Sequence, residues 1–145
     1  MFKNLFKTPT KQGIIKDDEK ISAITALLVE AALVDGNFDV DETNTIVSII
    51  KNTFSMQDEG AIKLLIENAR VDIESHGDLV TYTRTIKENW KLEDRIDVIE
   101  MMWKVCFVDG KIEPYEDMLI RRVAGLIYVS DKDRSHAKKK IQKSK

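Results

Sequence analysis

Apolar residues recur at helical spacing along most of this chain. From Ile21 to Val34 they occupy almost every position around a helix, a pattern that only a buried central helix tolerates. The other apolar stripes are narrower, and in the third helix the stripe aligns Ala61, Leu64, Leu65 and Asn68. Together the stripes predict helices over residues 17–34, 40–54, 57 to 71 or 73, 92–107 and 113–126, and a last helix from 131 into the lysines at 138–140. This pattern is typical of an all-α protein.

Residues 79–86 (LVTYTRTI) are ambiguous, because β-branched side chains and partial alternation also suit a strand. No other segment offers itself as a pairing partner, and a lone strand is not stable. We therefore predict a helix here as well, which makes the chain a single-domain bundle of about seven helices.

One short stretch occurs twice. Residues 33–42 (LVDGNFDVDE) and 107–116 (FVDGKIEPYE) lie 74 positions apart and share the order apolar run, Asp-Gly, apolar residue, acid, Glu. The segments around them, about 20–73 and 92–142, repeat the same succession of helices. Because one copy of such a unit usually buries its apolar face against the other, we predict two helical hairpins packed about an approximate twofold axis.

Charge is distributed unevenly along the chain. Residues 1–16 carry four lysines and no acid, residues 132–145 carry seven basic residues against one acid, and residues 17–131 have a net charge of −12. An acidic body binds nucleic acid poorly, so we expect no nucleic-acid partner. We expect two parts, a flexible basic N-terminal segment (1–16) and a helical domain (17–145).

The N-terminal segment leaves two alternatives open. Phe2, Leu5 and Phe6 would share one face of a helical turn beside lysines, which suits a weak anchor for a membrane surface or a protein partner. A frayed chain terminus fits the same residues. No apolar run approaches the ~20 residues needed to cross a bilayer. Because residues 1–7 are also too short for a signal-peptide core, we expect a cytoplasmic protein. Cys106, the sole cysteine, falls in an apolar run, so we expect a buried thiol in a reducing compartment.

The repeated acids are spaced as helix caps. Two pairs have the spacing of a capping box, Asp39 with Glu42 and Glu113 with Glu116. In such a box the first side chain accepts from the N3 amide, and the N3 Glu reaches back to the N-cap amide. Pro114 would stand at the first helical position, where its missing N–H costs nothing. Each cap stabilises a helix by ~1 kcal/mol, which is a sufficient reason for these acids.

Asp35 and Asp109 fit capping less well, because each would sit at the C-terminal end of a helix, where the dipole disfavours negative charge. They either accept turn amides across the following glycine or bind a cation together with the capping acids. The candidate metal ligands are therefore Asp35, Asp39, Glu42, Asp109, Glu113 and Glu116. Such an oxygen-rich set suits Ca²⁺ or Mg²⁺, although the loop is not an EF-hand, since its glycine stands second instead of sixth.

Catalytic motifs are not recognisable in the sequence. His76 and His136 are far apart, and neither belongs to a Cys/His cluster. P-loop, GxGxxG, GxSxG and CxxC motifs do not occur. We expect a protein that is not an enzyme and that uses no cofactor beyond the candidate cation.

Three stretches together resemble the TerB-like family. They are LLVEAA (27–32) followed by Asp35-Gly36, YTRTI (82–86), and WKVCFVDGKIEPYEDMLIRRVAGLIYVS (103–130). The resemblance covers about 20–134 and is closest to the stand-alone branch of the family. It implies an all-α domain of two pseudo-symmetric halves, related in fold to the N-terminal helical domain of a DnaJ-type co-chaperone. It also implies a link to stress such as tellurite, no established catalysis, and divalent-metal binding by the six acids named above.

Two hypotheses follow for the function. In the first, the paired Asp-Gly loops form an acidic site for a divalent cation or a basic partner. In the second, the chain is a scaffold or a co-chaperone-like module that binds other proteins, and its acids only cap helices. One form of this hypothesis places the module at the membrane surface. Replacing Asp35 and Asp109 by Asn separates them, because only the first hypothesis predicts the loss of cation-dependent stabilisation.

Overall fold

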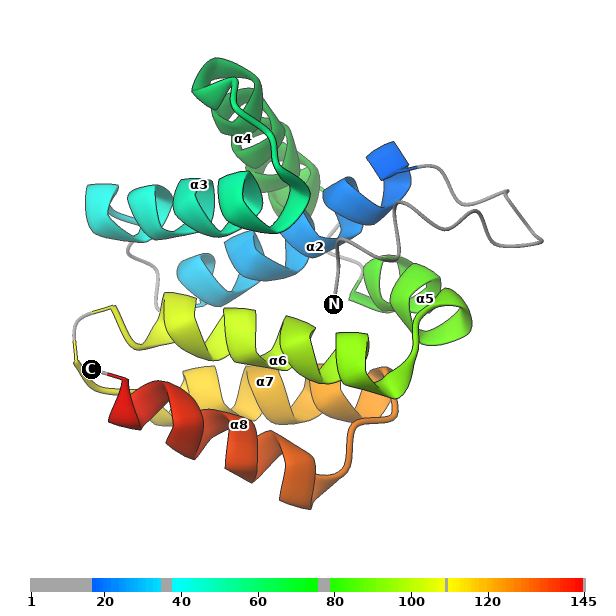
Figure 1. Ribbon diagram of the computed structural model, residues 1–145. Coiled ribbons are helices and arrows are strands. Elements are labelled where there is room, and N and C mark those ends of the chain that lie inside the picture. Colours follow the sequence, from blue (N-terminus) through cyan, green and yellow to red (C-terminus); the bar gives the residue numbers. More distant parts are fainter. Residues whose placement is uncertain (1–16, 35–37, 76–78, 109, 145) are drawn as a thin grey trace.

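The computed structural model describes residues 17–34, 38–75, 79–108 and 110–144, and within these ranges the chain forms helices and no strands. The helices are α2 (Asp17–Leu33), α3 (Val40–Phe54), α4 (Glu59–Ser75), α5 (Leu79–Asn89), α6 (Leu92–Cys106), α7 (Pro114–Leu126) and α8 (Asp131–Lys143). These seven described helices confirm the predicted all-α bundle (Figure 1). Residues 1–16, predicted to be a flexible segment, lie outside the described ranges, and the twofold relation stays a prediction.

The ambiguous segment 79–86 is helical, as predicted, and forms most of α5. Leu79, Thr83 and Ile86 are its buried residues, and their spacing of four and three places them on one helical face. The Thr83 hydroxyl donates to the Leu79 carbonyl at 2.9 Å, which satisfies this buried polar group inside the helix. Contacts with α2 and α7 therefore outweigh the strand propensity of the β-branched residues.

Helix α2 is the centre of the bundle. It contacts α3, α4, α5, α6 and α7. Its buried apolar residues lie all round the helix, as the sequence pattern predicted; they are Ala23, Ile24, Ala26, Leu27, Leu28, Val29, Ala31 and Ala32. Burying a Leu or Ile side chain stabilises the fold by roughly 1.5–3 kcal/mol, so this helix supplies a large share of the core.

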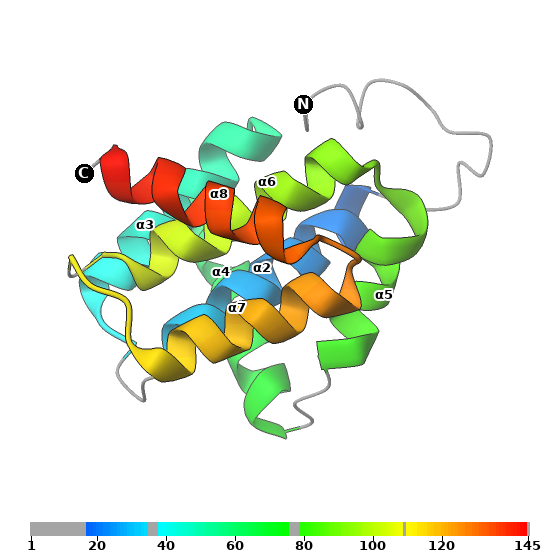
Figure 2. The same cartoon turned by 90° about the horizontal axis from the view of Figure 1, so that it is seen from below.

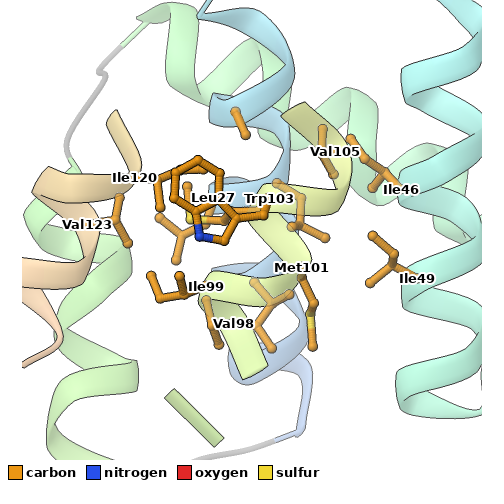
Figure 3. Packing of buried hydrophobic residues seen from close by; sticks show 14 of the residues in the cluster. Leu27, Ile46, Ile49, Val98, Ile99, Met101, Trp103, Val105, Ile120 and Val123 are labelled. Atoms are coloured by element: carbon orange, nitrogen blue, oxygen red, sulfur yellow. The ribbon is translucent and has the colours of Figure 1, made fainter. Parts of the chain in front are cut away.

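Helix α6 forms the second layer of the core, between α3 on one side and α7 on the other (Figure 3). Ile46 and Ile49 approach it from α3, while Ile120 and Val123 approach it from α7. Trp103 on α6 is fully buried among these helices. Cys106, one turn later, is 3% exposed, which confirms the predicted buried thiol.

Two helices end in ways that the sequence did not signal. Ser55 after α3 and Tyr128 after α7 adopt left-handed backbone conformations, with φ of 57° and 60°. Glycine is the usual residue there, because a Cβ strains this conformation. Gly110 has a positive φ of 91° and lies beyond Phe107, the residue that caps α6. The first pair, Asp35-Gly36, lies outside the described residues.

Candidate functional site

The start of α3 is held by the predicted capping box. The Glu42 amide donates to Asp39 Oδ1 at 2.9 Å, and the Asp39 amide donates to Glu42 Oε1 at 3.2 Å. Glu42 is only 6% exposed, so its carboxylate is a buried part of the helix end. The sequence prediction of a cap at this position is confirmed.

The start of α7 repeats this arrangement. The Glu113 amide donates to Glu116 Oε1 at 2.7 Å, and Pro114 occupies the first turn. Glu116 is 3% exposed, and Lys111 Nζ lies 3.7 Å from the Glu113 carboxylate. Both copies of the repeated acids therefore have a structural task, which is to satisfy amides at the start of a helix.

Both capped helix starts lie at the same end of the molecule. Figures 1 and 2 agree that α2 and α6 end there and that α3 and α7 begin there. Asp35 and Asp109, the two candidate ligands without a capping role, lie outside the described residues. Within the described ranges, no group of three or more His, Cys, Asp or Glu side chains is placed to hold a metal ion. Asp39 and Glu42 meet in one capping box, and Glu113 and Glu116 meet in the other.

A polar cleft of about 590 Å³ lies between α3, α6 and α8. Hydroxyl and amide side chains of α3 face charged side chains of α6 and α8 across it, among them Ser48, Asn52, Asp97, Glu100, Lys104 and Lys140. Burial raises the pKa of Asp97, and the nearby carboxylates of Glu100 and Asp94 raise it further. Lys140 Nζ pairs with Glu100 at 3.3 Å. The two acids and the two lysines of this cleft are thus balanced in charge. Their arrangement does not indicate a particular ligand.

Helix α4 carries apolar side chains on two faces. Ile62 and Ile66 are its buried residues, and the helix packs against α2 and α3. The stripe that the sequence pattern aligned is a different one, and Leu64 at its centre is 61% exposed. The core face of α4 is therefore formed by Ile62 and Ile66 and not by this stripe.

A groove of about 430 Å³ follows this uncovered stripe, between α4 and the start of α2. It is lined by Ile21, Ser22, Met56, Ala61, Leu64, Leu65 and Asn68. The sequence pattern did not lead us to predict this groove. A signal for it was present, because α4 has more apolar positions than one buried face requires. Exposed apolar surface of this kind marks interaction sites more often than isolated apolar residues do.

The segment that forms the α4 side of the groove is rich in acids, although Glu67 and Glu74 line a separate hollow beside Phe38. Residues 55–75 carry five acids and two basic residues. Some of these charges pair locally: Lys51 Nζ lies 2.9 Å from Glu59, and Arg70 pairs with Glu67 and Glu74. The Asp58 carboxylate accepts from the Ala61 amide at 3.2 Å at the start of α4.

Helix α8 carries the basic C-terminal residues, and several of them have partners. Lys138 Nζ lies 3.1 Å from Asp117 and 5.1 Å from the centre of the Trp103 ring. Arg121, on α7, pairs with Asp117 at 3.4 Å. His136 is exposed on this helix, and His76 lies outside the described residues. No catalytic arrangement is visible among these described groups.

The fold and these surfaces define a small all-α domain with a buried central helix and two acid-capped helix starts. The family model described as Tellurite resistance protein TerB matches residues 22–139. The chain belongs to this family. No curated protein and no solved structure matched the chain. Among the described helices, none is long and apolar enough to cross a membrane.

Proposed function

We propose that this chain is a non-catalytic interaction domain that binds an amphipathic, basic polypeptide segment in the groove beside α4. The observation that carries the proposal is the 61% exposure of Leu64 in a groove whose other walls include Ile21, Met56 and Leu65. An amphipathic helix binds such a groove through apolar anchors at spacings of three and four residues.

Charge supports a basic partner. The helix that forms one wall of the groove lies in a segment with five acids and two basic residues, within a body of net charge −12. Complementary charge speeds the encounter and fixes the orientation of a bound segment more than it adds affinity. We therefore expect apolar anchors to supply the affinity and flanking Lys or Arg residues to supply the selectivity.

The repeated acids then serve the fold of the domain. Capping boxes at the starts of α3 and α7 account for Asp39, Glu42, Glu113 and Glu116 without a ligand. This agrees with the second sequence hypothesis, an interaction module whose acids cap helices.

Comparative co-purification tests this function. Full-length chain is compared with Leu64→Asp and with Met118→Asp, a control that places the same charge on α7 at a residue that is 68% exposed. A partner lost with Leu64→Asp but retained with Met118→Asp supports the groove. Its binding segment is then added as a synthetic peptide, which should shift the amide NMR signals of Ala61, Leu65 and Asn68. A partner that binds all three chains equally, or a peptide that leaves these signals unchanged, contradicts the proposal.

A second candidate is a divalent cation site at the end where α3 and α7 begin. It is favoured by the placement of both capped helix starts at one end of the molecule (Figures 1 and 2). Each capping carboxylate has a second oxygen, and Asp35 and Asp109 would complete a site for Ca²⁺ or Mg²⁺. At ~100 times its Kd, a cation that binds only the folded chain adds ~2.7 kcal/mol. Thermal unfolding of the metal-stripped chain should show a higher melting temperature when millimolar cation is added. The double variant Asp35→Asn with Asp109→Asn should lose this increase. An unchanged melting temperature in the parent chain rejects the cation site.

A further inference from the structure

The groove beside α4 opens at the point where residues 1–16 join the fold. Helix α2 begins at Asp17, and Ile21 and Ser22, about one turn later, form part of the groove wall. A segment that precedes α2 therefore starts about one helical turn from this groove.

The sequence of that segment has the chemistry of the expected ligand. Phe2, Leu5 and Phe6 follow the spacing of three and four residues that one helical face requires. Lysines flank them, at Lys3 and Lys7. With four lysines and no acid, residues 1–16 are opposite in net charge to residues 55–75, the segment that contributes the α4 side of the groove.

The connection is long enough for this contact. The eleven steps from Phe6 to Asp17 span at most roughly 35–40 Å when extended, whereas the 17 residues of α4 are about 26 Å long. A short tether also raises the effective concentration of the segment to the order of millimolar, so even weak apolar anchoring would keep the groove occupied.

We propose that Phe2, Leu5 and Phe6 dock in the α4 groove of the same chain and cover Leu64. This inference rests on the proposed function, because it identifies the chain's own N-terminal segment as a ligand of that groove. Docking in cis makes the segment a competitor, and a partner must displace it before binding.

Amide NMR on the full-length chain tests the docking. The variant Phe2→Asp with Phe6→Asp removes two apolar anchors, while Thr8→Asp with Thr10→Asp makes the same change in charge off the apolar face. We expect the first variant to shift the amide signals of Ala61, Leu65 and Asn68, and the second to leave them near their original positions. Both pairs lie outside the described helices, and circular dichroism checks that the fold is retained. Signals that match in the original chain and the Phe2/Phe6 variant overturn the proposal.

A synthetic peptide of residues 1–8 separates this inference from the function on which it rests. Added at millimolar concentration to the Phe2/Phe6 variant, the peptide should return the three amide signals toward their original positions. Adding Leu64→Asp to that variant should abolish the effect. If the peptide shifts the three amide signals but the Phe2/Phe6 variant has the same signals as the original chain, docking in cis is rejected. The groove then remains a binding site for a separate segment. If the peptide shifts none of these signals, the inference is rejected, and the co-purification experiment decides the function separately.

Discussion

The indole N–H of Trp103 donates to the main-chain carbonyl of Arg134 at 3.3 Å. This bond joins the last turn of α6 to the first turn of α8, two helices that pack against each other. Lys138, one helical turn further along α8, places its ammonium over the same ring. The tryptophan thus ties α8 to the core by a hydrogen bond, by apolar burial and by a cation–π contact.

Replacing Trp103 by Phe should lower the free energy of unfolding by about 2 kcal/mol. The change removes a buried hydrogen bond, leaves the Arg134 carbonyl without this donor, and opens a cavity. Urea unfolding measures the loss. Lys138→Met keeps the indole bond and should cost less than ~1 kcal/mol. Equal losses in the two variants would contradict the dominant role of the indole N–H and ring volume.

Asp39→Ala should destabilise the chain by about 1 kcal/mol, because the Glu42 amide loses its side-chain acceptor. Asp39→Asn is the matched control, since an Asn oxygen caps as well as a carboxylate does. It should remain within a few tenths of a kcal/mol of the original chain. The midpoint of urea unfolding decides between them. An Asn variant as unstable as the Ala variant would show that Asp39 acts through its charge.

Asp97→Asn should make the chain more stable near neutral pH, and this advantage should fade in acid. Burial and the carboxylates of Glu100 and Asp94 raise the folded-state pKa of Asp97 above its ordinary value of 3.8, against a smaller opposing effect of Lys140. The folded chain therefore holds this proton more tightly, and it loses stability as pH rises from that value through the raised pKa. Because the group is partly exposed, the effect should stay below ~1 kcal/mol.

Unfolding curves at several pH values check this dependence on Asp97. Glu93→Gln removes one charge from an exposed position on the same helix and provides the control. A gain for Asp97→Asn that is the same at pH 3 and pH 7 would contradict the mechanism.

Tyr128→Gly should be about 1 kcal/mol more stable than Tyr128→Ala. Both changes remove the ring and its contact with Lys87, but residue 128 has a φ of 60°, which only glycine adopts without a Cβ penalty. The Val129 amide donates to the Ala124 carbonyl at 2.8 Å, so Tyr128 lies in the turn that closes α7.

Gly125 provides the contrasting position inside the same helix. A Cβ there would meet nothing within 4 Å, so Gly125→Ala should stabilise the chain by roughly 0.5–1 kcal/mol. Thermal unfolding of the three variants measures both differences. If alanine is preferred at 128 as well as at 125, backbone strain is not what distinguishes the two positions.

The caps of the bundle could be predicted from single segments, because capping is a local interaction. The box of Asp39 and Glu42 joins residues three apart, and it fixes where α3 begins whatever packs around it. The same holds for Pro114 and the start of α7. The all-apolar pattern of α2 also left only one location for this helix, the centre of the core.

The candidate site could be predicted less well, because it depends on neighbours that are distant in sequence. Helix α4 has apolar residues on two faces, and its own periodicity does not decide which face is covered. Packing against α2 and α3 buries Ile62 and leaves Leu64 in the groove.

Local pattern thus determined the helices, their starts and the central place of α2 in this protein. Tertiary structure alone decided which side of α4 stays open and how far burial raises the pKa of Asp97. The physical reason is the distance along the sequence over which each interaction acts. Capping and helical periodicity act within a few residues, whereas burial and electrostatic environment are set by helices that meet only after the chain has folded.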